Sequence, residues 1–104
     1  MKLTVFERIT LLGVLPEHGN FVTLKIIRQL REALSFTEQE LASLELKQDG
    51  ERVTWNPAAA EPGGSEIIIG EKATDIIVEA LKKLNDEGKL TEQHFTLYEK
   101  FIGG

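Results

Sequence analysis

The side chains in this sequence that could do chemistry are two histidines, three serines and 17 acids. His18 and His94 stand far apart, and neither has a partner at the spacing of a zinc motif such as His-Glu-x-x-His. None of Ser35, Ser43 and Ser65 stands in the Gly-x-Ser-x-Gly turn that exposes a serine nucleophile. Cysteine is absent, which excludes thiolate metal ligands, disulfides and thiol nucleophiles. We therefore expect no catalytic residue, no metal site and no enzymatic activity.

Two stretches are similar to phosphate-binding loops, but each lacks a necessary part. Residues 70–72 (Gly-Glu-Lys) follow an apolar run and open a helix, as a P-loop does. The glycine expected four residues earlier is missing, and a glutamate separates the Gly-Lys pair. Residues 62–65 (Pro-Gly-Gly-Ser) precede a strand, so no helix N-terminus is available there for an anion. We expect no bound cofactor.

The composition is that of an ordinary globular domain. The chain has 104 residues, 41% hydrophobic and 28% charged, which predicts a single domain over residues 1–104. No apolar run reaches the roughly 18 residues of a membrane span, and charges interrupt the N-terminal segment where a signal peptide would be apolar. We expect the protein to lie either in the cytoplasm of a host cell or in a virion. The net charge of −5 argues against general binding to nucleic acid.

Apolar residues repeating every three or four positions predict helices, and alternating ones predict strands. The expected elements are helices 3–15, 21–34 and 38–43, a hairpin around Asp49-Gly50 starting near Leu44, a strand 66–69, and helices 71–87 and 92–102. The expected helix caps are Thr4, Asn20, Thr91 and a capping box of Thr37 with Glu40. The fold class is therefore α+β, with three N-terminal helices, a small antiparallel sheet and two C-terminal helices.

The packing of these elements follows from the apolar stripes. We expect Phe6, Ile9, Leu12 and Leu15 to form the main stripe of the first helix. In the last helix the expected face is Phe95, Tyr98, Phe101 and Ile102. Because isolated hairpins are barely stable, strand 66–69 should pair with one hairpin strand, and helix 71–87 should cover the resulting sheet. Residues 57–65 should form an exposed loop.

Five residues are candidates for binding a partner. Lys25, Arg28 and Arg31 lie off the apolar stripe of the second helix and face only one acid, Glu32, on it. Phe36 and Trp55 are large aromatic residues near element ends, and tryptophan is enriched among the residues that dominate binding energy at interfaces.

Two alternative functions use the charged residues. Three helices followed by a hairpin are typical of winged-helix DNA binders, in which Lys25, Arg28 and Arg31 would contact phosphates. The acids from the third helix to the hairpin could instead mimic nucleic acid and inhibit a protein that binds it. These acids are Glu38, Glu40, Glu45, Asp49 and Glu51.

A resemblance covers both ends of the chain. The segments 3–8, 15–16 with 19–20, 23–26, 69–75, 90–94 and 97–101 together resemble small uncharacterised proteins of tailed bacteriophages and prophages. The resemblance implies a genomic setting and a role in morphogenesis, host takeover or inhibition, exerted by binding another protein. Our preferred prediction is a non-enzymatic protein-interaction module with an unidentified protein partner. It could also form a homodimer through its apolar first or last helix.

Overall fold

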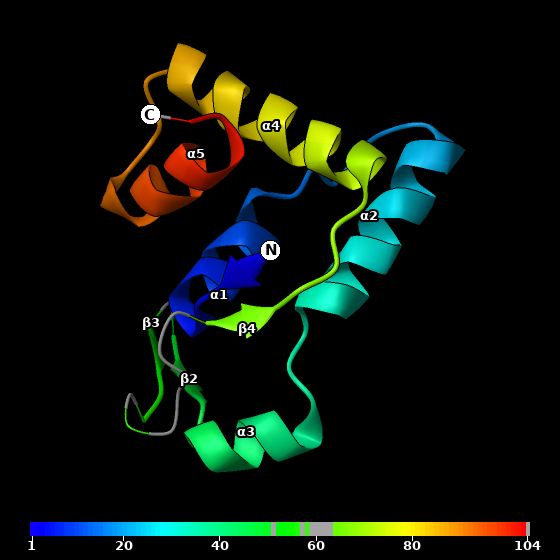
Figure 1. Cartoon of the computed structure of the whole chain (residues 1–104). Coiled ribbons are helices and arrows are strands. Elements are labelled where there is room, and N and C mark those ends of the chain that lie inside the picture. The colour runs from blue at the N-terminus through cyan, green and yellow to red at the C-terminus, as the bar shows by residue number, and fades with distance from the viewer. Residues whose placement is uncertain (51, 57, 59–63, 104) are drawn as a thin grey trace.

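Helices dominate the fold and two very small sheets complete it (Figure 1). The computed structural model describes residues 1–50, 52–56, 58 and 64–103. The elements are β1 (Lys2–Leu3), α1 (Val5–Val14), α2 (Phe21–Leu34), α3 (Glu38–Leu44), β2 (Lys47–Asp49), β3 (Arg52–Thr54), β4 (Ser65–Glu66), α4 (Glu71–Asp86), the 3₁₀ helix η2 (Glu92–His94) and α5 (Phe95–Phe101). The predicted α+β class and the order of helices and hairpin are confirmed.

Side-chain caps fix where the first three helices begin, as predicted. The Thr4 hydroxyl accepts from the Glu7 N–H, and the Glu7 carboxylate accepts from the Thr4 N–H at 2.9 Å. Thr37 and Glu40 form the same capping box at α3. The Asn20 side chain accepts from the Thr23 N–H at the start of α2. Thr4 therefore ends β1 and starts α1, so the first helix begins at Val5 and not at Leu3.

The pairing of the third strand differs from the prediction. The strand there comprises Ser65–Glu66, shorter than the predicted 66–69, and it pairs with β1, antiparallel, with Lys2 opposite Glu66 and Leu3 opposite Ser65. The N-terminal amine adds to this pairing, because it donates to Glu66 Oε1 at 2.9 Å and to the Ile67 carbonyl at 3.0 Å. The prediction was wrong because Leu3, which was predicted to begin the first helix, instead forms with Lys2 the strand that pairs with Ser65–Glu66.

The hairpin stands alone as the second two-stranded sheet. Asp49 pairs with Arg52 and Gly50 has φ +65°, so the expected glycine occupies the turn. Leu44, expected in the first strand, is the buried last residue of α3, and Glu45 follows it in the left-handed conformation at φ 53°. Of the predicted loop 57–65, residues 57 and 59–63 lie outside the described part of the chain.

Helix α1 is the centre of the hydrophobic core. It packs against β1, α2, α4, η2 and α5, which surround it in Figure 1. The buried core is formed by Leu3, Leu11, Leu15, Ile27, Leu30, Leu34, Ile67, Ala73, Ile77, Leu81 and Leu97. Helix α4 therefore packs on other helices, and the predicted covering of the hairpin by it is wrong. Within α1, Leu11 is the buried apolar residue, whereas Phe6 is 42% exposed and the other apolar side chains are partly buried.

Two predicted apolar stripes are confirmed only in part: Leu12, Leu15, Tyr98, Phe101 and Ile102 lie in or against the core, whereas Phe6 and Phe95 are exposed. In α1, Phe6 is 42% exposed, whereas Glu7 and Arg8 are each only 3% exposed. In α5, Phe95 is 62% exposed and Leu97 is fully buried. Both corrections have the same cause: the angle at which a helix meets its neighbours selects the buried face, and the sequence alone offers two adjacent faces.

Candidate functional site

Helix α2 carries the most exposed cluster of large apolar side chains in the described residues. Phe21 is 80% exposed, Val22 60% and Leu24 41%, all within its first turn. Leu24 lies at the edge of the stripe that the buried residues Ile27, Leu30 and Leu34 form. Since contiguous exposed apolar groups on a monomer mark interaction sites more often than scattered ones, this turn is the first element of a candidate surface.

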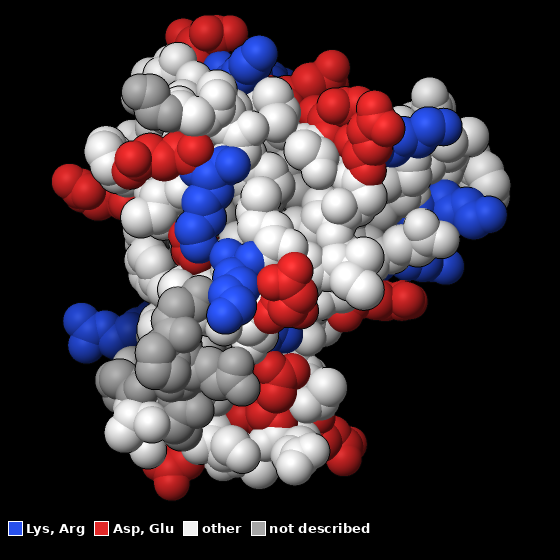
Figure 2. Space-filling view, viewed as in Figure 1, with Lys and Arg blue, Asp and Glu red and all other residues white. Residues whose placement is uncertain are grey.

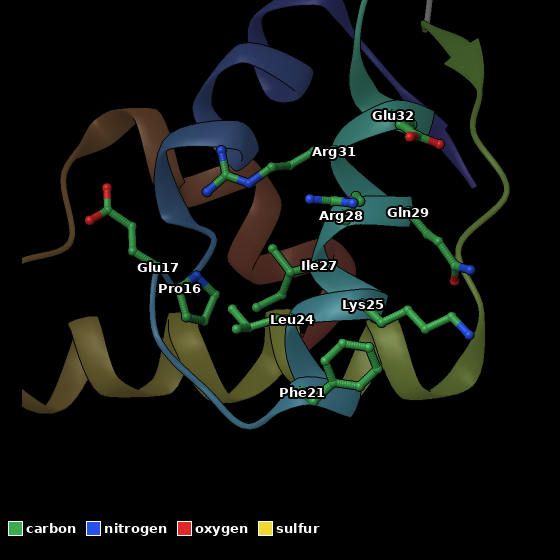
Figure 3. Close-up of a pocket in the computed structure, with 10 residues that line it drawn as sticks. All are labelled: Pro16, Glu17, Phe21, Leu24, Lys25, Ile27, Arg28, Gln29, Arg31 and Glu32. Carbon is green, nitrogen blue, oxygen red and sulfur yellow. The ribbon is translucent and has the colours of Figure 1, made fainter.

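One flank of α2 borders a hollow of about 810 Å³ (Figure 3). Leu24 and Ile27 point toward Pro16 in the α1–α2 loop, so the floor of the hollow is apolar. Arg28 and Arg31 extend toward the same side, and Lys25 and Gln29 extend to the other side of the helix. The remaining lining residues are Glu17, Phe21 and Glu32. We call this hollow the α2 groove.

The structure brings the three predicted cations together on this groove. Lys25, Arg28 and Arg31 all line it, and basic side chains gather over α2 in Figure 2. The salt bridges within the described residues join the N-terminal amine to Glu66, Arg8 to Glu40, Lys89 to Glu87 and Lys100 to Glu7. None of these pairs includes a cation of the groove.

A second hollow, of about 410 Å³, lies on the opposite flank of α2. Ile26, Leu30 and Ala33 of the helix line it together with Ile68 and Ile69 of the segment between β4 and α4. Ile68 is 88% exposed, the highest value of any large apolar side chain in the described residues. Helix α2 is therefore a ridge with an apolar hollow on each side.

Trp55 lies in a third hollow, away from α2. Its ring faces that of Phe6 with the centroids 6.2 Å apart and the planes tilted by 36°. Arg52 and His94 line the same hollow of about 610 Å³. The hairpin and α2 lie on opposite sides of α1 (Figure 1), so Trp55 does not share a surface with the three cations. Trp55 is partly exposed in this hollow, so its role in binding a partner stays a prediction.

Phe36 is occupied by an intramolecular contact that the sequence did not reveal. The guanidinium carbon of Arg8 lies 4.0 Å from the centre of the Phe36 ring. Arg8 also donates from Nε to the Leu34 carbonyl at 3.1 Å and from Nη2 to the Ser35 carbonyl at 2.7 Å. Its Nη1 donates to Glu40 Oε2 at 2.7 Å. Arg8 therefore fastens the end of α2 and the start of α3 to α1.

The buried charges of α1 are matched by partners on other elements. The Arg8 hydrogen bond lowers the pKa of Glu40 below its ordinary value, although partial burial opposes this. For Glu7, burial raises the pKa, and hydrogen bonds from Lys100, the Thr4 backbone and Thr96 more than offset it, so its pKa is lowered. Lys100 Nζ donates to Glu7 at 2.6 Å and to the Lys2 carbonyl at 3.0 Å. Both carboxylates are structural.

The positions of Glu7 and Arg8 could have been inferred from the sequence. Arg8 stands three and seven positions before Leu11 and Leu15, and Glu7 stands four before Leu11. Two charges on a helix face with those leucines indicate buried, paired groups. The exposure of Phe21 has no such signal, because a phenylalanine at a helix start is equally consistent with burial.

The remaining candidates for chemistry are accounted for locally. The Thr91 N–H donates to His94 Nδ1 at 3.0 Å, and Thr91 is the N-cap of η2, as predicted for the start of the last helix. No three His, Asp or Glu side chains of the described chain are placed to hold a metal ion together. No helix there has the length and apolar character needed to cross a membrane.

The acids proposed as a nucleic-acid mimic are not all available for that role. Glu40 is engaged by Arg8, while Glu38 and Glu45 are exposed. Glu51 lies outside the described residues, and the side chain of Asp49 is not described.

Comparisons with protein-family models, with curated proteins and with solved structures found no significant match to this chain.

Proposed function

We propose that this chain is a protein-interaction module without catalytic activity, and that it contacts a protein partner through α2. The observation that carries the proposal is the exposure of Phe21, Val22 and Leu24 in one turn beside the α2 groove. The core is complete without Phe21 and Val22, so the fold does not explain why these positions are apolar. Binding a partner would remove this apolar surface from water.

A symmetric homodimer through α2 is less favourable than a complex with a different protein. In a two-fold dimer whose axis passes beside the groove, Arg28 and Arg31 of one copy would lie close to the same cations of the other. Like charges placed opposite each other at an interface cost several kcal/mol. A homodimer through the first or last helix stays a prediction, since Phe6 of α1 and Phe95 of α5 are 42% and 62% exposed.

The test is affinity capture with the full chain as bait in the cells that produce it, which the resemblance suggests are phage-infected or lysogenic bacteria. Burying a phenylalanine contributes about 1.5–3 kcal/mol, so Phe21→Ser should weaken capture of a true partner by about ten- to hundredfold. Phe95→Ser is the matched control, because Phe95 is 62% exposed on α5. Circular dichroism should show both variants folded. A partner that is lost equally with both variants, or with neither, contradicts the proposal.

A further inference from the structure

The charge of the α2 groove is opposite to that of the rest of the chain. Its ten lining residues carry a net charge of +1, from Lys25, Arg28 and Arg31 against Glu17 and Glu32, while the whole chain carries −5. None of the three cations takes part in a salt bridge with a described carboxylate. The groove thus presents Arg28 and Arg31, neither of which has a carboxylate partner among the described residues, over an apolar floor.

We propose that the α2 groove binds an acidic amphipathic helix of a partner protein, an inference that rests on the proposed function of α2 as the contact face. The apolar side of such a helix would lie on Leu24, Ile27 and Pro16, which point toward one another in Figure 3. The carboxylates of the partner helix would accept hydrogen bonds from the guanidinium groups of Arg28 and Arg31, which extend over the same floor.

The dimensions of α2 suit this occupant. A helix of 14 residues is about 21 Å long, so three to four turns of a partner helix would run along it. Leu24, Ile27, Arg28 and Arg31 stand at i, i+3, i+4 and i+7, which places two apolar and two basic groups on one flank. A partner helix with leucines and glutamates at the same spacings would match both kinds of group.

Nucleic acid fits the groove less well than an acidic helix. Phosphates would contact Arg28 and Arg31, but they would leave the apolar floor and Phe21 without a partner. The net charge of −5 also repels a polyanion at long range, whereas a short acidic helix carries few charges. The hairpin, which would be the wing of a winged-helix domain, lies away from α2.

The experiment titrates the isotopically labelled full chain with a synthetic helical peptide that has leucines on one face and glutamates on its flanks. A scrambled peptide of the same composition, a peptide with lysine in place of glutamate, and a short DNA duplex serve as comparisons. We expect saturable binding of the acidic amphipathic peptide alone, with amide shifts in the nuclear magnetic resonance spectrum centred on Leu24, Ile27 and Arg28.

Charge reversal provides the matched control. The double variant Arg28→Glu with Arg31→Glu should lower the affinity for the acidic peptide at least about tenfold, because each close charge pair at an interface contributes about that much affinity or more. Lys82→Glu with Lys83→Glu changes the net charge equally on α4 and should leave the affinity within about twofold.

Four results would overturn the inference: no binding of the acidic amphipathic peptide, equal binding of the scrambled peptide, preference for the lysine peptide or DNA, or equal effects of the two charge reversals. If capture in cells is lost with Phe21→Ser while the acidic peptide fails to bind, the interaction function of α2 stands and only the acidic chemistry of the partner is wrong. If capture is unaffected as well, both proposals are wrong.

Discussion

Replacing Arg8 by methionine should destabilise the protein more than any change at its partner Glu40. Arg8 is 3% exposed, makes three hydrogen bonds of 2.7 to 3.1 Å and stacks on Phe36. Methionine fills part of the space, but it leaves the Leu34 and Ser35 carbonyls without their donor. A buried acceptor left without its donor costs about 1–3 kcal/mol, so two such carbonyls together with the lost packing should cost about 3–5 kcal/mol, a large part of the stability of a small domain.

Changing Glu40 should cost far less because its side chain is 34% exposed. Glutamine keeps an acceptor oxygen for Arg8 Nη1, and Arg8 retains the Leu34 and Ser35 carbonyls, so Glu40→Gln should cost about 1 kcal/mol. The asymmetry between the two variants is the point of the experiment. A larger loss for Arg8→Met than for Glu40→Gln would mean that Arg8 stabilises the fold mainly through the backbone carbonyls and its packing, and less through the ion pair.

The assay is urea unfolding at neutral pH, followed by far-UV circular dichroism and by the fluorescence of Trp55, the single tryptophan. Trp55 follows β3 next to α1, so its signal reports the hairpin end of the molecule, whereas circular dichroism reports mainly the helices. We expect Arg8→Met to lower the midpoint urea concentration of unfolding. The midpoint measured by fluorescence should fall at least as far as the midpoint measured by circular dichroism. Arg28→Met is the control, because Arg28 is exposed on α2 and should cost less than about 0.5 kcal/mol. A cost below about 1 kcal/mol for Arg8→Met, or an equal cost for Glu40→Gln, would refute this reasoning.

Two further outcomes are expected. Gly64→Ala should destabilise the protein by about 2–5 kcal/mol, because Gly64 has φ +95° and an added Cβ would overlap the Leu3 carbonyl. Gly13→Ala is the control: Gly13 lies in open space on α1, so this change should be neutral or stabilising by up to about 1 kcal/mol. Thermal melts that rank the two variants equally would contradict this prediction. The free energy of unfolding should fall as the pH drops below about 4.5, the ordinary pKa of a glutamate, because the pKa values of Glu7 and Glu40 are lowered in the folded state and protonation removes their favourable contacts. Urea titrations across this range should show a shallower pH dependence for Glu40→Gln than for the native chain, and an unchanged dependence would contradict the assignment.

The helices could be predicted from the sequence because their signals are local. Thr4, Asn20 and Thr37 cap the first three helices where expected, since a cap depends only on residues two or three positions away. The strand pairing could not be predicted in this way. Two residues, Lys2–Leu3, carry no period that distinguishes a strand from the start of a helix, and their partner Ser65–Glu66 is more than 60 positions later.

The candidate site was predicted in part. Lys25, Arg28 and Arg31 all line the groove, but Arg28 and Arg31 extend to one side of α2 and Lys25 to the other. Phe36 and Trp55 were chosen by residue type, which cannot show that Arg8 and Phe6 contact them. The groove itself depends on where the α1–α2 loop passes Leu24 and Ile27, and that is a property of tertiary packing.

The cations of this protein divide into two groups with different roles. Arg8 and Lys100 are satisfied within the chain and connect elements distant in sequence, whereas Arg28 and Arg31 have no described carboxylate partner. Stability and binding should therefore separate under substitution. Phe21→Ser should leave the free energy of unfolding nearly unchanged and remove partner binding, because an 80% exposed side chain contributes little to the core.

Arg8→Met should have the opposite effect, lowering stability while leaving partner affinity intact at temperatures where the domain remains folded. If Phe21→Ser instead unfolds the domain, or if Arg8→Met weakens binding in the fully folded state, then α2 is not an independent contact face. The exposed turn would in that case have to be explained by the fold itself.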